Sequence, residues 1–179
     1  MVLASRLLSA IPLPGRVATT DLFHDVAERA KRENVTFFFL GAAEDIIKRA
    51  VDRVGDKYPN LKIVGYRNGY FSPSEEDSVV SAINAASPDI LWIGMGAPNE
   101  QRFCVSHRAK LDRVGLIKTA GGLFDFVSGK NGRAPGWMQS AGLEWAYRMA
   151  LEPRRLAYRY LTTNPHALYL LLTASGQRS

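Results

Sequence analysis

The sequence has only one cysteine, Cys104, among its 179 residues. A single thiol cannot form an internal disulfide or supply a cysteine-rich zinc site. The sequence also lacks a run of about 18 to 20 apolar residues, the length that a membrane-spanning helix needs. Internal repeats and low-complexity tracts are absent too. These absences exclude a disulfide scaffold and an integral membrane helix, and they favour a globular protein in a reducing, cytoplasmic compartment.

Several motifs of well-known enzyme classes are also missing. The sequence contains no GxxxxGK[ST], no GxSxG, no HExxH and no closely spaced DxD pair. The three histidines, His24, His107 and His166, are scattered over expected helices, and we expect them at the surface. The sequence therefore predicts no zinc site, no Ser-His-Asp triad and no bound cofactor.

Positive charge is concentrated in the last quarter of the chain. The sequence has 23 basic and 17 acidic residues, a net charge of +6 and a pI near 9.6. Residues 133–179 contain six arginines and two acidic side chains, and so carry +4 of this total. Such an excess suggests a polyanionic partner, which leaves nucleic acid, an anionic membrane surface and phosphate-bearing ligands as alternatives.

Short apolar runs alternate with helical patterns before this basic region. We predict strands at residues 35–41, 61–65, 89–96 and 115–120, and helices at residues 21–33, 44–54, 72–86 and 100–111. Ser72, Pro73 and Glu75 predict a capping box at the start of the third helix. This alternation predicts an α/β, Rossmann-like fold with a mostly parallel sheet flanked by helices, in which ligands bind at the carboxyl ends of the strands.

A glycine-containing loop, GMGAPNEQ, follows the third predicted strand. Gly94 and Gly96 would let a ligand approach the backbone closely, and the next helix would offer its first N–H groups to a phosphate. The loop does not have the spacing of the G-x-G-x-x-G fingerprint, so an ordinary strand–helix turn capped by Asn99 is an equally good interpretation. Gln101, in the first turn of that helix, is a candidate to present its amide to the same ligand.

A second glycine loop follows the next predicted strand and contains Gly121 and Gly122. Two such loops on consecutive strands suit a nucleotide. Asp125 is a candidate to accept hydrogen bonds from ribose hydroxyls, and the alternative is a carboxylate that caps or pairs within the core. Tyr70 and Phe71, after the second predicted strand, are candidates to stack on a base, or else to pack against the helix that follows them.

The basic region combines arginines with aromatic residues. Its helical patterns cover residues 135–143, 144–151 and 153–172, which predicts a helical appendage. Arginines matched to phosphate oxygens and flanked by aromatic rings are typical of a membrane interface. A solvated helix packed on the core is the alternative, and nucleic-acid binding ranks third because no DNA- or RNA-binding motif accompanies the charge. The residues concerned are Arg133, Arg148, Arg154, Arg155 and Arg159, with Trp137, Trp145, Tyr147, Tyr158 and Tyr160.

Three blocks of sequence resemble one bacterial family. They are GMGAPNEQ, then GGLFDFVSGKNGRAPGWMQSAGLEWAYR, then EPRRLAYRY, and the upstream runs LPGRVATTDLF and FFFLGAAEDI are similar as well. Together they resemble the WecG/TagA/CpsF family of glycosyltransferases over essentially the whole chain. The resemblance implies an inverting transferase of cell-surface polysaccharide synthesis, peripheral on the inner face of the cytoplasmic membrane.

The resemblance also implies substrates and site residues. The donor would be a UDP-sugar carrying N-acetylmannosamine, its uronic acid or glucose, and the acceptor an undecaprenyl-diphosphate-linked glycan, with no nucleic acid involved. Asp125 would bind ribose, and Tyr70 or Phe71 would lie near uracil. Gly94, Gly96, Asn99, Gly121 and Gly122 would line the donor site. Arg16 and Gln101 would belong to the catalytic machinery. The acceptor diphosphate and the membrane would be bound by Arg133, Arg148, Arg154, Arg155 and Arg159.

Members of the family usually begin tens of residues earlier, with strands and an Asp-Gly motif that holds the expected catalytic aspartate. The resemblance therefore implies a catalytic base upstream of Met1. On this comparison residues 1–132 are a nucleotide-sugar-binding α/β core without that segment, and residues 133–179 are the appendage for acceptor and membrane. The alternative function is a truncated, inactive module that binds nucleotide or phosphate. A sheet edge left open by missing strands would also favour homo-oligomers.

Overall fold

The computed structural model describes residues 18–141 and 143–151, and farther on residues 153, 161, 163, 165, 166, 169, 170 and 173. The chain divides into two compact units. One is Ala18–Gly132, and the other contains the described residues from Arg133 onward. The first unit holds the sheet and most of the helices.

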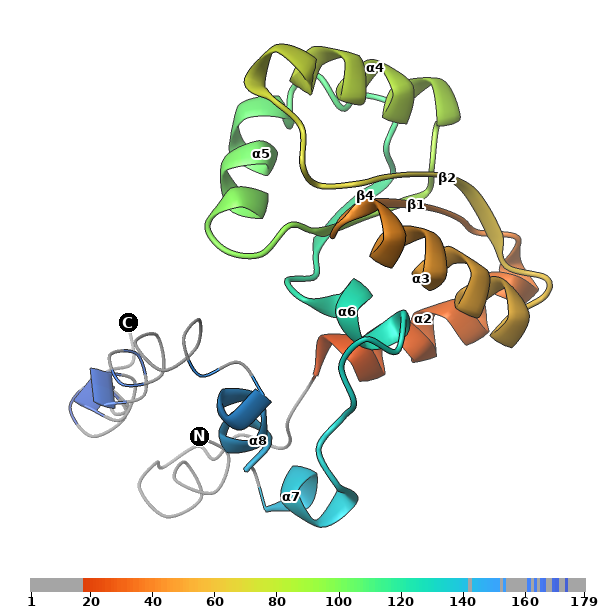
Figure 1. The fold of residues 1–179 in the computed structure, drawn as a ribbon. Helices are drawn as coiled ribbons and strands as arrows, with labels where there is room; N and C mark the ends of the chain where they lie inside the picture. The colour runs from red at the N-terminus through yellow and green to blue at the C-terminus, as the bar shows by residue number, and fades with distance from the viewer. Residues whose placement is uncertain are drawn as a thin grey trace. The chain divides into compact units, whose positions relative to one another are not determined.

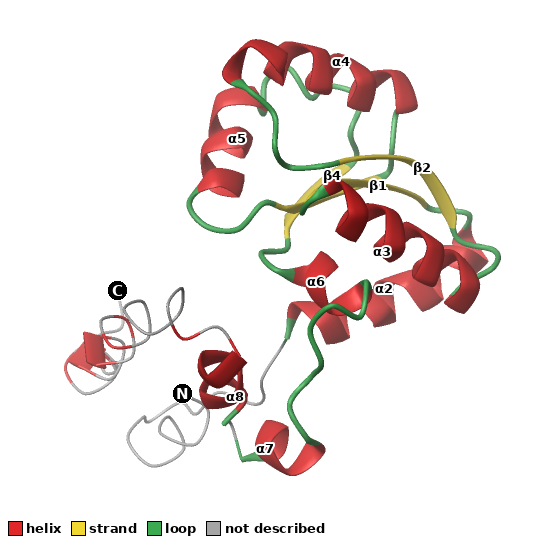
Figure 2. Cartoon of the chain, in the orientation of Figure 1, coloured by secondary structure: helices red, strands yellow, loops and turns green. Residues whose placement is uncertain are grey.

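Four parallel strands make up the sheet of the first unit (Figure 2). They are β1 (Thr36–Gly41), β2 (Lys62–Arg67), β3 (Ile90–Gly94) and β4 (Leu116–Thr119). The strand order is β2-β1-β3-β4, so β1 and β3 are central and β2 and β4 are edges. The predicted Rossmann-like α/β fold with a parallel sheet is confirmed, and each strand lies within two residues of its predicted bounds.

Helices cover both faces of this sheet (Figure 1). The helices α2 (Thr19–Glu33), α3 (Glu44–Lys57) and α6 (Leu123–Val127) lie on one face. On the other face lie α4 (Glu76–Ala86) and α5 (Asn99–His107). Each helix between consecutive strands carries the chain back to the start of the next parallel strand, so all four strands point their carboxyl ends in one direction.

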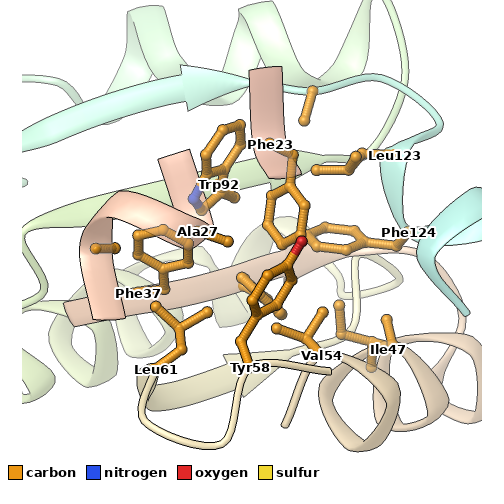
Figure 3. Close-up of a cluster of buried hydrophobic side chains, with 14 of the residues drawn as sticks. Phe23, Ala27, Phe37, Ile47, Val54, Tyr58, Leu61, Trp92, Leu123 and Phe124 are labelled. Atoms are coloured by element: carbon orange, nitrogen blue, oxygen red, sulfur yellow. The ribbon is translucent and has the colours of Figure 1, made fainter. Parts of the chain in front are cut away.

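The central strands are apolar on both faces because both faces are covered. Phe37 and Phe39 of β1 and Trp92 of β3 pack with α2, α3 and α6, and the alternate residues of these strands pack with α4 and α5. Figure 3 shows the first cluster, in which the ring of Phe23 from α2 meets Trp92 edge-on at a centroid distance of 5.1 Å. Burial of these large rings supplies the main stabilisation of the unit.

The helix starts differ in detail from the predicted ones. The third helix begins as a short 3₁₀ turn, η1 (Pro73–Glu75), and its capping box is confirmed: the Ser72 N–H donates to Glu75 Oε2 at 2.8 Å. The helix predicted over 100–111 ends at His107 instead, in α5. Asn99 as a helix cap is wrong, because Pro98 occupies the cap position and Asn99 is the exposed first residue of α5.

The predicted surface position is also wrong for His107. Its side chain is buried in α5, where Nε2 lies 2.7 Å from Glu76 Oε2 and the ring lies 4.8 Å from that of Phe103. His24 is half-buried, with Nδ1 2.8 Å from the Tyr58 hydroxyl. His107 is therefore a core residue whose Nε2 pairs with a carboxylate while its Nδ1 is buried without a hydrogen-bond partner among the described residues, a position that its helical spacing alone does not reveal.

The second unit contains two short helices, α7 (Gly136–Ser140) and α8 (Glu144–Leu151). They correspond to the predicted helices at 135–143 and 144–151, and α8 has the predicted bounds. The third predicted helix, 153–172, lies largely outside the described residues. No helix in the part of the chain that the structure describes is long and apolar enough to cross a membrane.

Candidate functional site

Two loops at the carboxyl ends of β3 and β4 leave open space beside their backbone. Gly96, between β3 and α5, has a φ of +74°, and Gly121, between β4 and α6, has a φ of +58°. These left-handed conformations favour glycine. A Cβ added at either position would meet no atom within 4 Å. The two glycines therefore expose backbone at the edge of the sheet where parallel α/β folds bind ligands.

Glu100 joins these two loops. Its backbone N–H donates to the carbonyl of Gly96 at 3.1 Å, and its carboxylate Oε2 accepts from the N–H of Gly121 at 2.9 Å. The side chain is 5% exposed, so this bond lies in a protected environment. Burial raises the pKa of the neighbouring Cys104 thiol, and the charge of Glu100 adds to that effect. One residue thus holds both glycine loops.

The other predicted residues of these loops have different surroundings. Gly94, the last residue of β3, is buried against Phe124, and a Cβ there would lie 2.6 Å from the ring, so its small size serves packing. Gly122 caps the start of α6. Asn99 is exposed at the start of α5. Gln101 is exposed too, and its amide Nε2 lies 3.4 Å from Glu100 Oε1.

The loop after β2 lies beside these loops through backbone hydrogen bonds. Gly69 donates to the carbonyl of Ala42 at 2.8 Å, and Ala42 donates to the carbonyl of Gly94 at 3.1 Å. The ends of β1, β2 and β3 are thereby linked in a row. Together with the Glu100 bond, this row makes the carboxyl edge of the sheet one connected surface.

The two aromatic residues of the loop after β2 differ in exposure. Tyr70 is 79% exposed, whereas Phe71 is half-buried and packs edge-on against Phe103 at a centroid distance of 6.0 Å. Asn68 Oδ1 accepts from the Tyr70 N–H at 3.0 Å, and Asn68 Nδ2 donates to Glu44 Oε2 at 2.6 Å. The loop therefore presents Tyr70 to solvent and uses Phe71 for packing.

Asp125 lies in α6, just after the Gly121 loop. Its side chain is 24% exposed, and Oδ1 accepts from Lys130 Nζ at 3.1 Å. A partly exposed carboxylate paired with an exposed lysine contributes little to stability. Asp125 is thus positioned close in sequence to the open backbone of Gly121, with a carboxylate that is not committed to the core.

The structure describes only two of the predicted arginines. Arg133 is half-buried and donates to Gln139 Oε1 at 2.9 Å. Arg148 belongs to α8. The other predicted arginines, Arg16, Arg154, Arg155 and Arg159, lie outside the described residues. Within the described ranges, no three or more His, Cys, Asp and Glu side chains form a group that could hold a metal ion.

The start of the chain is likewise outside the described residues, which begin at Ala18. Met1 and the segment that follows it therefore have no described position. The catalytic base that the family resemblance implies is not tested by the described residues. Its place relative to the glycine loops stays a prediction.

The sequence did not identify two side chains that matter at this edge of the sheet. Glu100 and Glu44 each stand in the first turn of the helix that follows a strand, and each accepts from the loop of a neighbouring strand. A first-turn carboxylate is so common at helix starts that its type and position carry no signal of a second partner. The order of the strands, which decides that partner, is needed to identify it.

Comparison with known proteins identifies the family to which this chain is related. The model of the "Glycosyl transferase WecG/TagA/CpsF family" matches residues 1–179. Two similar proteins carry the name N-acetylglucosaminyldiphosphoundecaprenol N-acetyl-beta-D-mannosaminyltransferase. The protein from Bacillus subtilis (strain 168) is 36% identical over 182 residues, which cover 100% of this chain and 68% of that protein. The one from Bacillus spizizenii is 35% identical over 155 residues, which cover 87% of this chain and 59% of that protein.

Proposed function

The chain belongs to the WecG/TagA/CpsF family of glycosyltransferases, and from this premise we propose that it transfers N-acetylmannosamine from a UDP-sugar to undecaprenyl-diphosphate-linked N-acetylglucosamine. The family resemblance drawn from the sequence is confirmed. The names of the two relatives support the sugar and the acceptor. Of the three sugars that the resemblance allows, N-acetylmannosamine is therefore the one we propose.

One observation supports a donor site at the carboxyl edge of the sheet. Gly96 and Gly121 leave open space beside their backbone, and Glu100 ties their two loops together. The α5 helix starts in the same loop, and the first-turn N–H groups of a helix attract phosphate oxygens. We infer that the diphosphate of the donor binds between these two loops.

The nucleoside would then extend toward the neighbouring loops. The exposed ring of Tyr70 is available to stack on uracil, whereas the packing of Phe71 against Phe103 favours a supporting role. The carboxylate of Asp125 suits the hydroxyls of ribose, because two adjacent hydroxyls can both donate to one carboxylate. Of the two candidates, Tyr70 and Phe71, we therefore propose Tyr70 as the residue that contacts uracil.

The second unit is proposed to bind the acceptor and the membrane surface. Its described residues include several exposed apolar side chains, namely Trp137, Leu143, Trp145, Leu151, Leu161, Tyr169 and Leu170. The same region carries six arginines, among them Arg133, Arg148, Arg154, Arg155 and Arg159. Exposed apolar and aromatic groups beside arginines suit the boundary where lipid phosphates meet acyl chains. A peripheral position on the inner face of the membrane follows from this proposal.

The transfer itself exchanges one bond for another. The bond between C1 of the sugar and the UDP oxygen breaks, a bond from C1 to the acceptor hydroxyl oxygen forms, and that hydroxyl loses its proton to a base. UDP departs with the electron pair and gains negative charge. N–H groups at the start of α5 would stabilise that charge in the transition state.

A transfer assay with the full chain tests this function. The chain is incubated with UDP-N-acetylmannosamine and a short-chain prenyl-diphosphate N-acetylglucosamine, and mass spectrometry follows the lipid-linked product. We expect release of one UDP for each disaccharide formed. UDP-glucose serves as the competing donor. Binding of UDP without any transfer would contradict the proposal and indicate a nucleotide-binding module instead.

The ribose contact is tested by one pair of substitutions. Asp125→Ala removes the proposed partner of the hydroxyls and should weaken UDP binding by about ten- to a hundredfold in calorimetry, since a hydrogen bond to a charged group contributes about 1.5–3 kcal/mol. Lys130→Ala is the matched control, because it removes the ion pair and leaves the carboxylate in place. Equal affinities of wild type and Asp125→Ala would exclude the ribose role.

A further inference from the structure

We propose that Glu100 is a positioning residue of the donor site, which sets the separation of the Gly96 and Gly121 loops through the reach of its side chain. This inference rests on the proposed function, because it assigns the binding of the UDP-sugar to these loops. Glu100 would not touch the substrate. It would act through the backbone of the two glycines, which borders the open space of the site.

The geometry supports this role from both sides of the residue. The main chain of Glu100 is bonded to Gly96, and its carboxylate is bonded to Gly121, so one residue spans the two loops. The Gly121 N–H is at the point where the backbone turns with a φ of +58°. A shift of this bond would reorient the peptide group that borders the open space.

Burial of the carboxylate strengthens the argument. Only 5% of the residue is exposed, and an ionised group pays a desolvation cost that an apolar side chain would avoid. The start of α5 offsets part of this cost, since the N-terminal end of a helix favours negative charge. What the carboxylate provides and an apolar group does not is a directional bond to the Gly121 loop.

The same contacts argue against a role for Glu100 as the base. One oxygen, Oε2, already accepts from Gly121 at 2.9 Å, and Oε1 faces the amide of Gln101 at 3.4 Å. A base must come within hydrogen-bond reach of the acceptor hydroxyl. A carboxylate enclosed between two loops of the protein is positioned to hold them rather than to meet a substrate.

Two substitutions distinguish the effect of the length of the Glu100 side chain from the effect of its charge. Glu100→Gln keeps the length of the side chain and an oxygen that can accept from Gly121, but removes the charge. Glu100→Asp keeps the charge but is one methylene shorter. If the length of the side chain matters, the Glu100→Gln variant should bind UDP within about twofold of wild type. The Glu100→Asp variant should bind UDP about tenfold more weakly, because it loses one hydrogen bond of this kind.

The experiment combines calorimetry of UDP binding with the amide NMR signal of Gly121 in the full chain. Without ligand, the Gly121 amide proton should move upfield in Glu100→Asp and stay near its wild-type position in Glu100→Gln. Glu28→Gln is the control for the loss of a carboxylate and should change neither readout, because Glu28 is a partly exposed residue of α2 that pairs with Lys31 of the same helix.

The outcomes distinguish this inference from the function on which it rests. Weaker binding by Glu100→Gln than by Glu100→Asp would show that the charge matters, and would overturn the positioning role. An altered Gly121 amide signal in Glu100→Asp with unchanged affinity would overturn it as well. If the wild-type chain bound no UDP, the proposed function would fail, whereas the Gly121 signal would still report whether the bond between the loops exists.

Discussion

The two ends of the sheet are both tied by carboxylates, but in different ways. At the amino end, Asp89 Oδ2 accepts from the N–H and the hydroxyl of Thr36, both at 2.7 Å, and the Asp89 N–H donates to the Thr36 hydroxyl at 2.9 Å. This exposed, reciprocal pair joins the starts of β1 and β3. At the carboxyl end, the buried Glu100 joins the loops after β3 and β4.

The difference indicates which end is built for binding. The Asp89 and Thr36 groups satisfy one another, and the pair connects two adjacent strands directly. The Glu100 bond instead spans two loops whose glycines, Gly96 and Gly121, border open space. A tie of the first kind stabilises the sheet, and a tie of the second kind also shapes a surface. Substitutions at the amino end should therefore change stability alone, whereas those at the carboxyl end should change both stability and binding.

The largest effect on stability is expected at the carboxyl end. Glu100→Ala should lower the free energy of unfolding by about 2 kcal/mol, because it removes a buried, charged acceptor and leaves the Gly121 N–H without it. Urea unfolding at pH 7 measures the change. A loss no greater than that of Asp89→Ala would show that burial does not strengthen this tie, and would remove the distinction between the two ends.

A smaller effect is expected for Asp89→Ala, at about 1 kcal/mol, because water can replace its partners at the exposed amino end. UDP affinity should be unchanged, since the amino end is opposite the proposed donor site. Calorimetry of this variant beside Glu100→Asp gives the test. A weaker UDP complex in Asp89→Ala would mean that the amino end also supports the donor site.

The stability that Asp89 adds should also depend on pH. Two hydrogen bonds hold the pKa of Asp89 below its usual range. The larger effect comes from the Thr36 N–H and the smaller from the Thr36 hydroxyl. A lowered folded-state pKa stabilises the ionised form, so the contribution is present above the ordinary Asp pKa of about 4 and is lost as pH falls through the folded value. Wild type and Asp89→Ala should therefore differ less at pH 3 than at pH 7 in urea unfolding.

The smallest effect is expected for Glu44, the exposed counterpart of Glu100. Glu44 Oε2 accepts from Asn68 Nδ2, and Asn68 in turn holds the Tyr70 N–H. Glu44→Ala should cost about 0.5 kcal/mol or less, since water competes for both groups at an exposed site. The UDP affinity of Glu44→Ala shows how much UDP binding depends on the hydrogen bonds that fix the position of Tyr70. An effect as large as that of Glu100→Ala would contradict the importance of burial.

Much of the fold was predictable from local patterns. The apolar run from Phe37 to Leu40 predicted a buried strand, and the Ser72–Glu75 capping box predicted the start of its helix; the structure confirms both. Glycine at positions 96 and 121 indicated the two loops of the proposed donor site. Predictions made from single side chains were less successful, as Asn99 and His107 show, because capping and burial depend on what packs nearby.

The sequence by itself determined the parallel α/β architecture, the glycine loops after β3 and β4, and membership of the glycosyltransferase family. These features follow from hydrophobic periodicity, from backbone conformations that favour glycine, and from long ordered motifs. Only the tertiary structure decided that Glu100 reaches Gly121 and that Phe71 packs on Phe103. Those contacts arise between residues that are far apart in the chain, and the order of the strands in the sheet brings them together.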